Sequence, residues 1–442
     1  MLEEHIFKIK DMKTVLGLFI ILHASVSTSA QTHLTAEESN PKKIEWMQGF
    51  PPPKDKIISA SDGSFFQFPA SRYSVCHMNQ FLPTTTVKAA TNNRYKFMME
   101  MDVAIDEITF KPLNSEKSMT WLESLDKNYT DGSLILHKGN IVYERYFGEL
   151  TPDGVHAAMS VSKTFTGTLG ALLIHEGELV ENELASTYVP ELKNSAFGDA
   201  TIRQILDMTT GLQYSEDYSD PNAEIWLFSS AGNPMPKPKT YTGPTNYYEY
   251  LETVEKAGKH GEVFGYKTIN TDAMGWILSR LTDKSIPDLL SERIWKPIGA
   301  HKDGYYQVDG AGIAFAGGGL SANLRDMAAF GEMIRQKGYF NNQQILPPEV
   351  IEDIMRGGNK DNFSKSSYKS LNGWSYRNMW WITHNEHGAF AARGVYGQTI
   401  YIDPKAEMVL VRFASHPEAK NSKIDPTSLP AYHAVAKYLI SK

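Results

Sequence analysis

The chain has 442 residues, of which 41% are hydrophobic, and a formal net charge of −7. That apolar content is enough for one large domain or two closely packed lobes, and the acidic balance gives no electrostatic footprint for nucleic acid. The single cysteine, Cys76, excludes an internal disulfide and a cluster of thiolate metal ligands. We expect Cys76 to be a small buried hydrophobe.

The first 30 residues have the pattern of a secretory signal peptide. Lys13 gives a basic start, residues 15–24 form an apolar run, and the small residues 28–30 precede Gln31. The apolar run is too short to cross a bilayer. We therefore expect cleavage near Gln31, no stable membrane insertion after cleavage, and a periplasmic or secreted protein. A buried N-terminal helix is the alternative interpretation.

Residues 31–70 are polar and rich in proline, which is typical of a surface arm. Further along, a Gly/Asn turn at 138–140 separates two β-rich runs, 134–137 and 141–148, and so predicts a hairpin. Residues 190–305 are mostly of helical character and include a long Pro/Gly-rich loop.

The last part of the chain returns to strands. A second hairpin is expected over residues 398–413, and a final helix runs roughly from Pro430 to Ile440. Strands at both ends with helices between them favour an α+β domain interrupted by a helical lobe.

The first candidate for chemistry is a Ser-x-x-Lys pair, Ser160 and Lys163, just before the apolar run 169–174. On a helix, residues three apart share a face, so the hydroxyl and the amine can meet. A serine needs a base to become a nucleophile, and burial lowers the pKa of a lysine until it can be that base. Ser160 as an ordinary helix N-cap is the alternative. The same pattern occurs elsewhere, at Ser39–Lys42, Ser124–Lys127 and Ser366–Lys369.

Two further stretches complete the candidate site. Tyr266, held near Lys267, could relay a proton to a leaving group, although a loop packing residue would look the same. Gly394 allows close backbone approach by a ligand. An edge strand at this glycine, with a free N–H beside Ser160, would complete an oxyanion hole; a bulged strand start is the alternative.

Residues 384–387 read His-Asn-Glu-His, which raises the alternative of a metallo-hydrolase. The helical zinc signature His-Glu-x-x-His is absent, however, and Gly388 follows at once. We interpret the stretch as a loop and expect neither a metal nor another cofactor.

Together these stretches resemble the serine β-lactamase and penicillin-binding-protein superfamily. The resemblance is to its class C and esterase-like branch, and within that branch to the 6-aminohexanoate-dimer hydrolases. It extends from about Arg72 to the C-terminus. The matching stretches are Arg72-Tyr73-Ser74, His77-Met78, Leu82-Pro83, Ser160–Lys163, Tyr214–Tyr218, Asp220-Pro221, Phe264–Tyr266, Asn270–Asp272, Trp380-Trp381, Gly394–Gln398 and Asp403-Pro404.

The resemblance implies a β-lactamase-like fold, in which helices flank an antiparallel sheet beside a mostly helical lobe. The serine hydrolase domain would span 71–442, with its α/β part at about 71–190 and 306–442 and the lobe at about 191–305. The fold implies a catalytic cleft between these two parts.

The resemblance also implies roles for individual residues. Ser160 would be the acyl-forming nucleophile, Lys163 its base and Tyr266 the proton donor to the leaving group. The backbone N–H groups of Ser160 and Val395 would hold the oxyanion. The residues implied to contact substrate are Tyr214, Gly394 and Trp381.

Two motifs depart from those of penicillin-recognising members. The second motif reads Tyr266-Lys267-Thr268 instead of Tyr-x-Asn, and the third reads Ala392-Arg393-Gly394 instead of Lys-Thr-Gly. The lysine that meets a β-lactam carboxylate is therefore missing, with Arg393 as a partial replacement.

We expect an exported serine hydrolase whose partner is a small-molecule amide or ester, with a homodimer left open as its assembly. A β-lactamase or DD-peptidase is one alternative, and a non-catalytic binding protein of the same fold is another.

Overall fold

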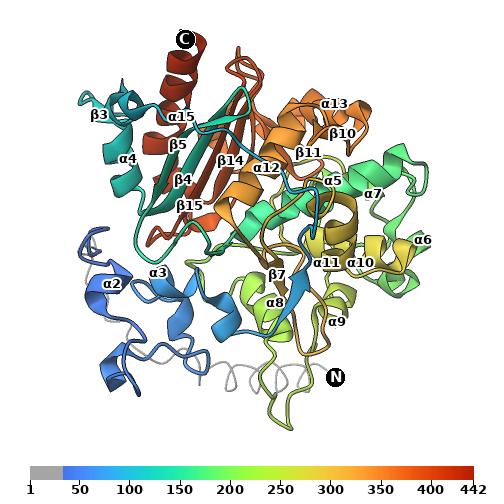
Figure 1. Cartoon of the computed structure of the whole chain (residues 1–442). Helices are drawn as coiled ribbons and strands as arrows, with labels where there is room; N and C mark the ends of the chain where they lie inside the picture. The colour runs from blue at the N-terminus through green and yellow to red at the C-terminus, as the bar shows by residue number, and fades with distance from the viewer. Residues whose placement is uncertain (1–32) are drawn as a thin grey trace.

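The computed structural model describes residues 33–442, so the expected signal peptide lies outside the described residues. Its largest element is a seven-stranded antiparallel sheet with the order β11-β12-β13-β14-β15-β4-β5 (Figure 1). The strands in that order are β11 (Ser375–Arg377), β12 (Trp380–Ile382), β13 (Phe390–Arg393), β14 (Thr399–Asp403), β15 (Met408–Ala414), β4 (Thr130–His137) and β5 (Asn140–Tyr146).

The two ends of the chain meet in the middle of this sheet. β15 pairs antiparallel with β4, and Val411 lies opposite Leu134. The β4–β5 turn uses positive φ angles at Lys138 (51°) and Gly139 (83°), as two-residue hairpin turns require. Both predicted hairpins are therefore confirmed, and one sheet joins the strands that precede and follow the helical region.

Helices cover both faces of the sheet. α5 (Ser162–His175) and α12 (Leu324–Arg335) pack on one face, and α4 (Trp121–Lys127) and α15 (Asp425–Ile440) on the other. Figure 1 shows α12 and α15 on opposite sides of the strands. Successive side chains of a strand point to opposite faces, so each strand contributes to both hydrophobic cores. The predicted α+β class, with an antiparallel sheet flanked by helices, is confirmed.

The final helix begins at Asp425, five residues before the predicted start at Pro430. A proline inside a helix removes the N–H that would bond to the carbonyl four residues earlier. Here that carbonyl belongs to Pro426, and it accepts a hydrogen bond from Leu113 N–H at 2.9 Å. The bond that Pro430 cannot make is thus replaced from outside the helix, and the helix continues through the proline.

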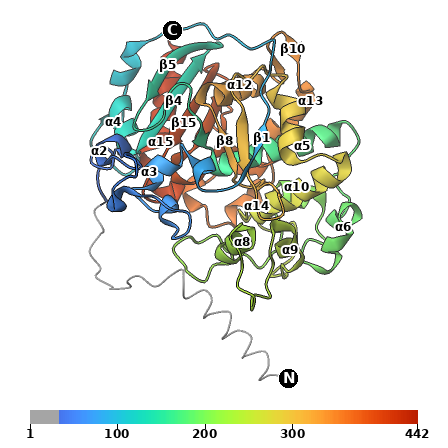
Figure 2. The ribbon, with the colours of Figure 1, turned by 60° about the horizontal axis from the view of Figure 1, so that its bottom comes forward.

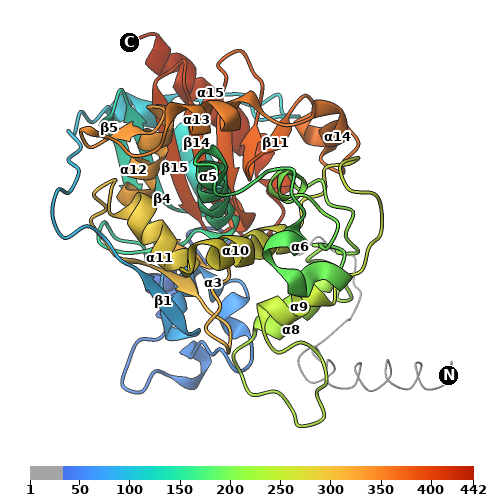
Figure 3. The ribbon, with the colours of Figure 1, turned by 90° about the vertical axis from the view of Figure 1, so that its right-hand side faces the viewer.

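The expected helical lobe lies below the sheet in Figure 3. α10 packs against both α5 and α7, so the apolar helix after Ser160 connects the lobe to the sheet. The helices of this region are α6 (Ala185–Tyr188), α7 (Ile202–Leu206), α8 (Glu224–Gly232), α9 (Tyr247–Glu252), α10 (Ile269–Thr282) and α11 (Ile286–Leu290).

A second, four-stranded sheet was not predicted. Its order is β1-β7-β8-β6, and Figure 2 shows β1 and β8 beside the main sheet. The strands have two to four residues, too few to display an alternating pattern. They are β1 (Thr84–Val87), β7 (Gly304–Gln307), β8 (Leu320–Ala322) and β6 (His156–Ala157).

The segment before Arg72 is tied to the domain by that residue. The guanidinium of Arg72 donates to Ser39 Oγ (2.9 Å) and pairs with Asp131 Oδ1 (3.1 Å), and all three side chains are buried. Cys76 is buried too, as expected. The remaining helices and strands are α2 (Pro41–Ile44), α3 (Ser71–Ser74), α13 (Pro348–Arg356), α14 (Lys360–Ser364), β2 (Thr109–Phe110), β3 (Met119–Thr120), β9 (Tyr339–Phe340) and β10 (Gln343–Gln344).

Over residues 33–442, none of the helices combines the length and the apolar composition needed to cross a membrane.

Candidate active site

Ser160 lies in a single 3₁₀ turn, Met159–Val161, between β6 and α5. Met159 adopts φ 47°, a left-handed conformation that costs a non-glycine residue roughly 1–3 kcal/mol and is common at functional sites. The residue at the N-cap of α5 is Val161, and it makes no side-chain cap bond. The alternative that Ser160 is an N-cap is therefore wrong.

Lys163 supplies the partner of the serine. Its Nζ donates to Ser160 Oγ at 2.9 Å and to the carbonyl oxygen of Gly317 at 2.6 Å. The side chain is 1% exposed. Burial lowers the pKa of the amine to about 8, against the opposing charges of Glu216 and Asp272. A sizeable fraction of the amine is thus neutral near neutral pH, and a neutral amine can accept a proton.

Tyr266 lies beside the amine of Lys163, and the centroid of its ring is 5.1 Å from Nζ. Burial and the charge of Glu216 raise the pKa of the phenol, and the nearby Ser160 hydroxyl opposes them to a smaller extent. The phenol therefore keeps its proton and can donate it. Trp381 holds it in place, since the two rings stack with centroids 5.3 Å apart, and Trp381 itself is 4% exposed.

Gly394 brings a second backbone segment against Ser160. A Cβ at Gly394 would lie 3.0 Å from Ser160 N and 3.0 Å from Ala158 O, so the approach depends on glycine. Within residues 33–442, the N–H groups of Ser160 and Val395 have no hydrogen-bond acceptor. Two unpaired donors beside a serine hydroxyl match the needs of an oxyanion hole.

The expectation of an edge strand at this position is wrong. β13 lies between β12 and β14 in the interior of the sheet. The N–H of Val395 is free for another reason, because the chain leaves the β13–β14 ladder after Gly394 and enters a 3₁₀ turn. Within that turn Tyr396 adopts φ 62°.

The structure adds two carboxylates to which the sequence analysis gave no role. Glu216 accepts a hydrogen bond from Thr268 N–H. Burial raises its pKa, and the charge of Lys163 opposes the rise. Asp272 lies in the first turn of α10, where burial raises its pKa to about 7. Asp272 directly precedes the apolar stretch 273–278 of a buried helix, and a buried acid is the available signal for it.

Asp272 acts on the lysine through a backbone turn. Its Oδ1 accepts from Gly317 N–H at 3.2 Å, and the carbonyl of the same glycine accepts from Lys163. A Cβ at Gly317 would lie 2.4 Å from Thr268 Cγ2 and 2.8 Å from Asp272 Oδ2. The carboxylate, the glycine turn and the amine therefore form one packed unit.

The predicted substrate residue Tyr214 is 7% exposed, and its hydroxyl is buried without a hydrogen-bond partner. Its ring meets Tyr250 edge to face within the helical lobe.

Tyr218, four residues after Tyr214, also lies close to the site. Burial and the charge of Glu216 raise the pKa of its phenol most, and the neighbouring phenols of Tyr396 and Tyr266 raise it further. Tyr218 thus joins the wall of the site, a position that the sequence analysis did not assign to it.

Arg393 does not replace the missing lysine of the third motif. Its guanidinium pairs with the carboxylate of Asp425, and the side chain is 6% exposed. The same group lies over the rings of Trp374 and Trp381, at 5.6 and 5.3 Å from their centroids. Its charge is therefore compensated inside the domain by Asp425.

The β-lactamase family profile matches residues 132–429, which include the serine, the lysine, the tyrosine and the glycine turn of the site. The chain belongs to the β-lactamase family. A curated relative in it, the 6-aminohexanoate-dimer hydrolase of Paenarthrobacter ureafaciens, is 30% identical over 357 residues, which cover 80% of this chain and 88% of the relative.

Solved structures agree with membership of the β-lactamase family. A Bacillus anthracis protein provisionally assigned as a 6-aminohexanoate-dimer hydrolase has a TM-score of 0.79 and 34% identity, covering 89% of this chain and 99% of its own. EstCE1, a hydrolase with promiscuous acyltransferase activity, shares the fold with a TM-score of 0.54 at 15% identity, covering 71% of this chain and 96% of its own. The chain is thus a serine hydrolase of the β-lactamase-like superfamily, as the resemblance implied.

Proposed function

We propose that this protein hydrolyses small linear amides or esters through an acyl-enzyme on Ser160. The observation that carries the proposal is the buried amine of Lys163, 2.9 Å from the serine hydroxyl, with a pKa lowered to about 8. A serine hydroxyl becomes nucleophilic when an adjacent base accepts its proton, and an amine with this pKa is such a base near neutral pH.

In the acylation step, neutral Lys163 takes the proton of Ser160 while Oγ forms a bond to the substrate carbonyl carbon. The carbonyl oxygen gains negative charge and accepts hydrogen bonds from the backbone N–H groups of Ser160 and Val395. As the C–N or C–O bond breaks, the Tyr266 phenol gives its proton to the leaving group and regains one from the protonated lysine. Water then attacks the acyl carbon and gives a proton to neutral Lys163. The lysine returns this proton to Ser160 Oγ as the ester bond to the serine breaks and the acid leaves.

The charges of the site narrow the substrate class. Arg393 is paired with Asp425, so no free cation stands at the third motif. The charged groups that act on the pKa of the lysine are the carboxyl groups of Glu216 and Asp272. This environment favours a substrate that is neutral or cationic near the scissile bond over a β-lactam, whose carboxylate needs a cation. Because a relative is named for a 6-aminohexanoate dimer, linear amides of amino acids are the first candidates.

We also propose that the protein is exported and acts in the periplasm or outside the cell. The support is the apolar run at residues 15–24 followed by small residues before Gln31. A mature chain that starts there would keep the described residues intact.

A fluorophosphonate probe and a substrate panel test the acyl-enzyme. The panel comprises a p-nitrophenyl ester, a 6-aminohexanoate dimer and nitrocefin. We expect the probe to label the peptide that contains Ser160 and the ester or amide to be turned over well ahead of nitrocefin. Ser160→Ala should lose both labelling and turnover.

Ser366→Ala is the matched control, because Ser366 belongs to another Ser-x-x-Lys pair whose lysine donates instead to the Ser364 carbonyl. It should behave as the wild type. A label on another residue, or full turnover by Ser160→Ala, would contradict the proposal, and fast nitrocefin hydrolysis would favour the β-lactamase alternative.

A further inference from the structure

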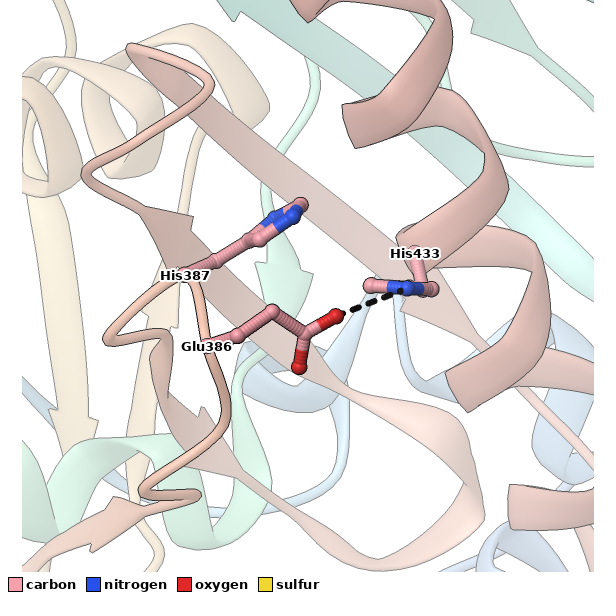
Figure 4. Close-up of side chains that lie close together, drawn as sticks. All are labelled: Glu386, His387 and His433. Carbon is pink, nitrogen blue, oxygen red and sulfur yellow. Dashed lines mark ion pairs between the residues drawn. The ribbon is translucent and has the colours of Figure 1, made fainter.

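A cluster of two histidines and one glutamate lies outside the candidate active site. We call it the His–Glu cluster; it consists of Glu386 and His387, from the loop between β12 and β13, and His433 from α15. The potential ligand atoms of the three side chains all lie within 4.8 Å of one another. Figure 4 shows the three side chains pointing toward a common space between the loop and the helix, with the ion pair between Glu386 and His433 marked.

A buried carboxylate orients one of the histidines. Nδ1 of His387 lies 2.7 Å from Oδ2 of Asp403, which is fully buried at the end of β14. A neutral imidazole that donates through Nδ1 has its lone pair on Nε2. Metal-binding histidines usually donate their second ring nitrogen to such a carboxylate, which fixes the tautomer and makes the ligand more basic. His387 is therefore in the form that a metal ligand needs.

The loop that carries His387 is fixed by its own hydrogen bonds. The Asn385 side chain accepts from the backbone N–H groups of His387 (3.2 Å) and Ala389 (2.9 Å). Thr383 Oγ1 donates to the carbonyl of Ala389 at 2.7 Å. The backbone that carries both loop ligands is thus fixed before any ion arrives, which lowers the ordering cost of binding.

We propose that the His–Glu cluster is a binding site for a divalent transition-metal ion of the zinc type. Two imidazoles and one carboxylate suit Zn²⁺ and related ions better than Mg²⁺ or Ca²⁺. Bonds of about 2.0–2.1 Å in a tetrahedron place ligand atoms roughly 3.3–3.5 Å apart. Glu386 and His433 are already 3.5 Å apart. The two pairs that involve His387 are at most 4.8 Å apart. They need to close by up to about 1.4 Å, which small side-chain rotations of the exposed Glu386 and the partly exposed His433 supply.

The site would be structural and not catalytic. The loop precedes β13, whereas Gly394, which touches Ser160, follows it, so the cluster and the serine lie at opposite ends of that strand. An ion here would fasten the β12–β13 loop to α15. The positive charge of Lys437, one turn after His433, would repel the bound ion. The negative charge of Glu386 would compensate for this repulsion. No metal was expected from the sequence because residues 384–387 lack the helical zinc signature and are followed at once by Gly388. The third ligand, His433, lies far from that stretch in the chain.

Titration of tag-free, chelator-treated full-length protein with Zn²⁺, followed by calorimetry, tests the proposal. Co²⁺ is the spectroscopic probe, since its visible absorption reports tetrahedral nitrogen and oxygen ligands. We expect one equivalent of Zn²⁺ to bind and to raise the melting temperature. His433→Gln and Glu386→Gln, both partly exposed, should each weaken binding at least tenfold, in line with the 10–100-fold losses seen even for outer-shell changes.

His175→Gln is the control, because His175 is exposed at the end of α5 and forms no such cluster with other residues of the described range 33–442. It should bind Zn²⁺ as the wild type does. The absence of stoichiometric binding, binding that survives in both cluster variants, or an equal loss in the control would each overturn the proposal.

Discussion

The pH dependence of ester hydrolysis should report the protonation of Lys163. With a pKa of about 8, the neutral fraction of the amine is about 1% at pH 6, about 50% at pH 8 and about 90% at pH 9, and kcat/KM follows the free-enzyme base. We therefore expect kcat/KM to rise about 90-fold from pH 6 to pH 9 and to level off there. A lysine with the ordinary value of 10.5 would give a tenfold rise per unit without a plateau in this range.

Asp272→Asn should move this profile to lower pH. The carboxylate raises the pKa of Lys163 while burial lowers it, so removal of the charge leaves burial less opposed. The amide oxygen can still accept from Gly317 N–H, which preserves the turn. A downward shift of one unit would increase the neutral fraction at pH 7 from about 9% to about 50%, roughly a fivefold gain.

The assay is initial-rate hydrolysis of a p-nitrophenyl ester from pH 5.5 to 9.5, with the Ser160→Ala protein as the blank for spontaneous hydrolysis. Asp217→Asn is the matched control, because Asp217 pairs with Lys420 and is about half exposed. Its midpoint should stay at the wild-type value. A wild-type profile without a plateau, or a midpoint that is unchanged or higher in Asp272→Asn, would refute the assignment of the base.

Further predictions concern other residues of the site and the N-terminus of the mature chain. Lys163→Ala should abolish both ester and amide cleavage. Tyr266→Phe should lower kcat/KM for an amide by about 10²–10⁴-fold and should lower it visibly less for a p-nitrophenyl ester, when both substrates are measured on one enzyme preparation. Equal losses would mean that the phenol is not the leaving-group acid. Gly394→Ala should lower kcat by between about 10-fold and 10²-fold with little change in melting temperature, because the new Cβ would lie 3.0 Å from the nitrogen of Ser160, one of the two oxyanion donors. An unchanged kcat would place the oxyanion elsewhere. N-terminal sequencing of exported protein should give a start near Gln31, and a cytosolic protein that keeps Met12 would disprove export.

Much of the fold could be predicted because its signals are local. The hairpin around residues 138–140 has a glycine at one of the two positions that need a positive φ, and the helix after Ser160 has a long apolar run. The small second sheet could not be predicted, since strands as short as β6 acquire their identity only from their partners. The predicted start of α15 was wrong because a proline such as Pro430 usually marks a helix boundary. The hydrogen bond from Leu113 that lets the helix contain this proline is a tertiary contact, which the sequence does not reveal.

The candidate site was predicted unevenly for a similar reason. Ser160 and Lys163 are three residues apart at the start of an apolar helical run, so their contact could be expected from local geometry. The interior position of β13 and the pairing of Arg393 with Asp425 depend on how distant segments meet. The role of Asp272 is harder still to predict, because its hydrogen-bonded link to the lysine runs through the backbone of Gly317.

The pairing of β15 with β4 has a consequence for biosynthesis. These strands are about 270 residues apart in the chain. The pairing of β4 with β15 therefore cannot form until almost the whole polypeptide has left the ribosome. Until then β4 shows an apolar strand with one unpaired edge, which is a template for aggregation. Nascent chains that end before residue 408 should therefore depend on chaperones to stay soluble, and that dependence should fall once β15 has emerged.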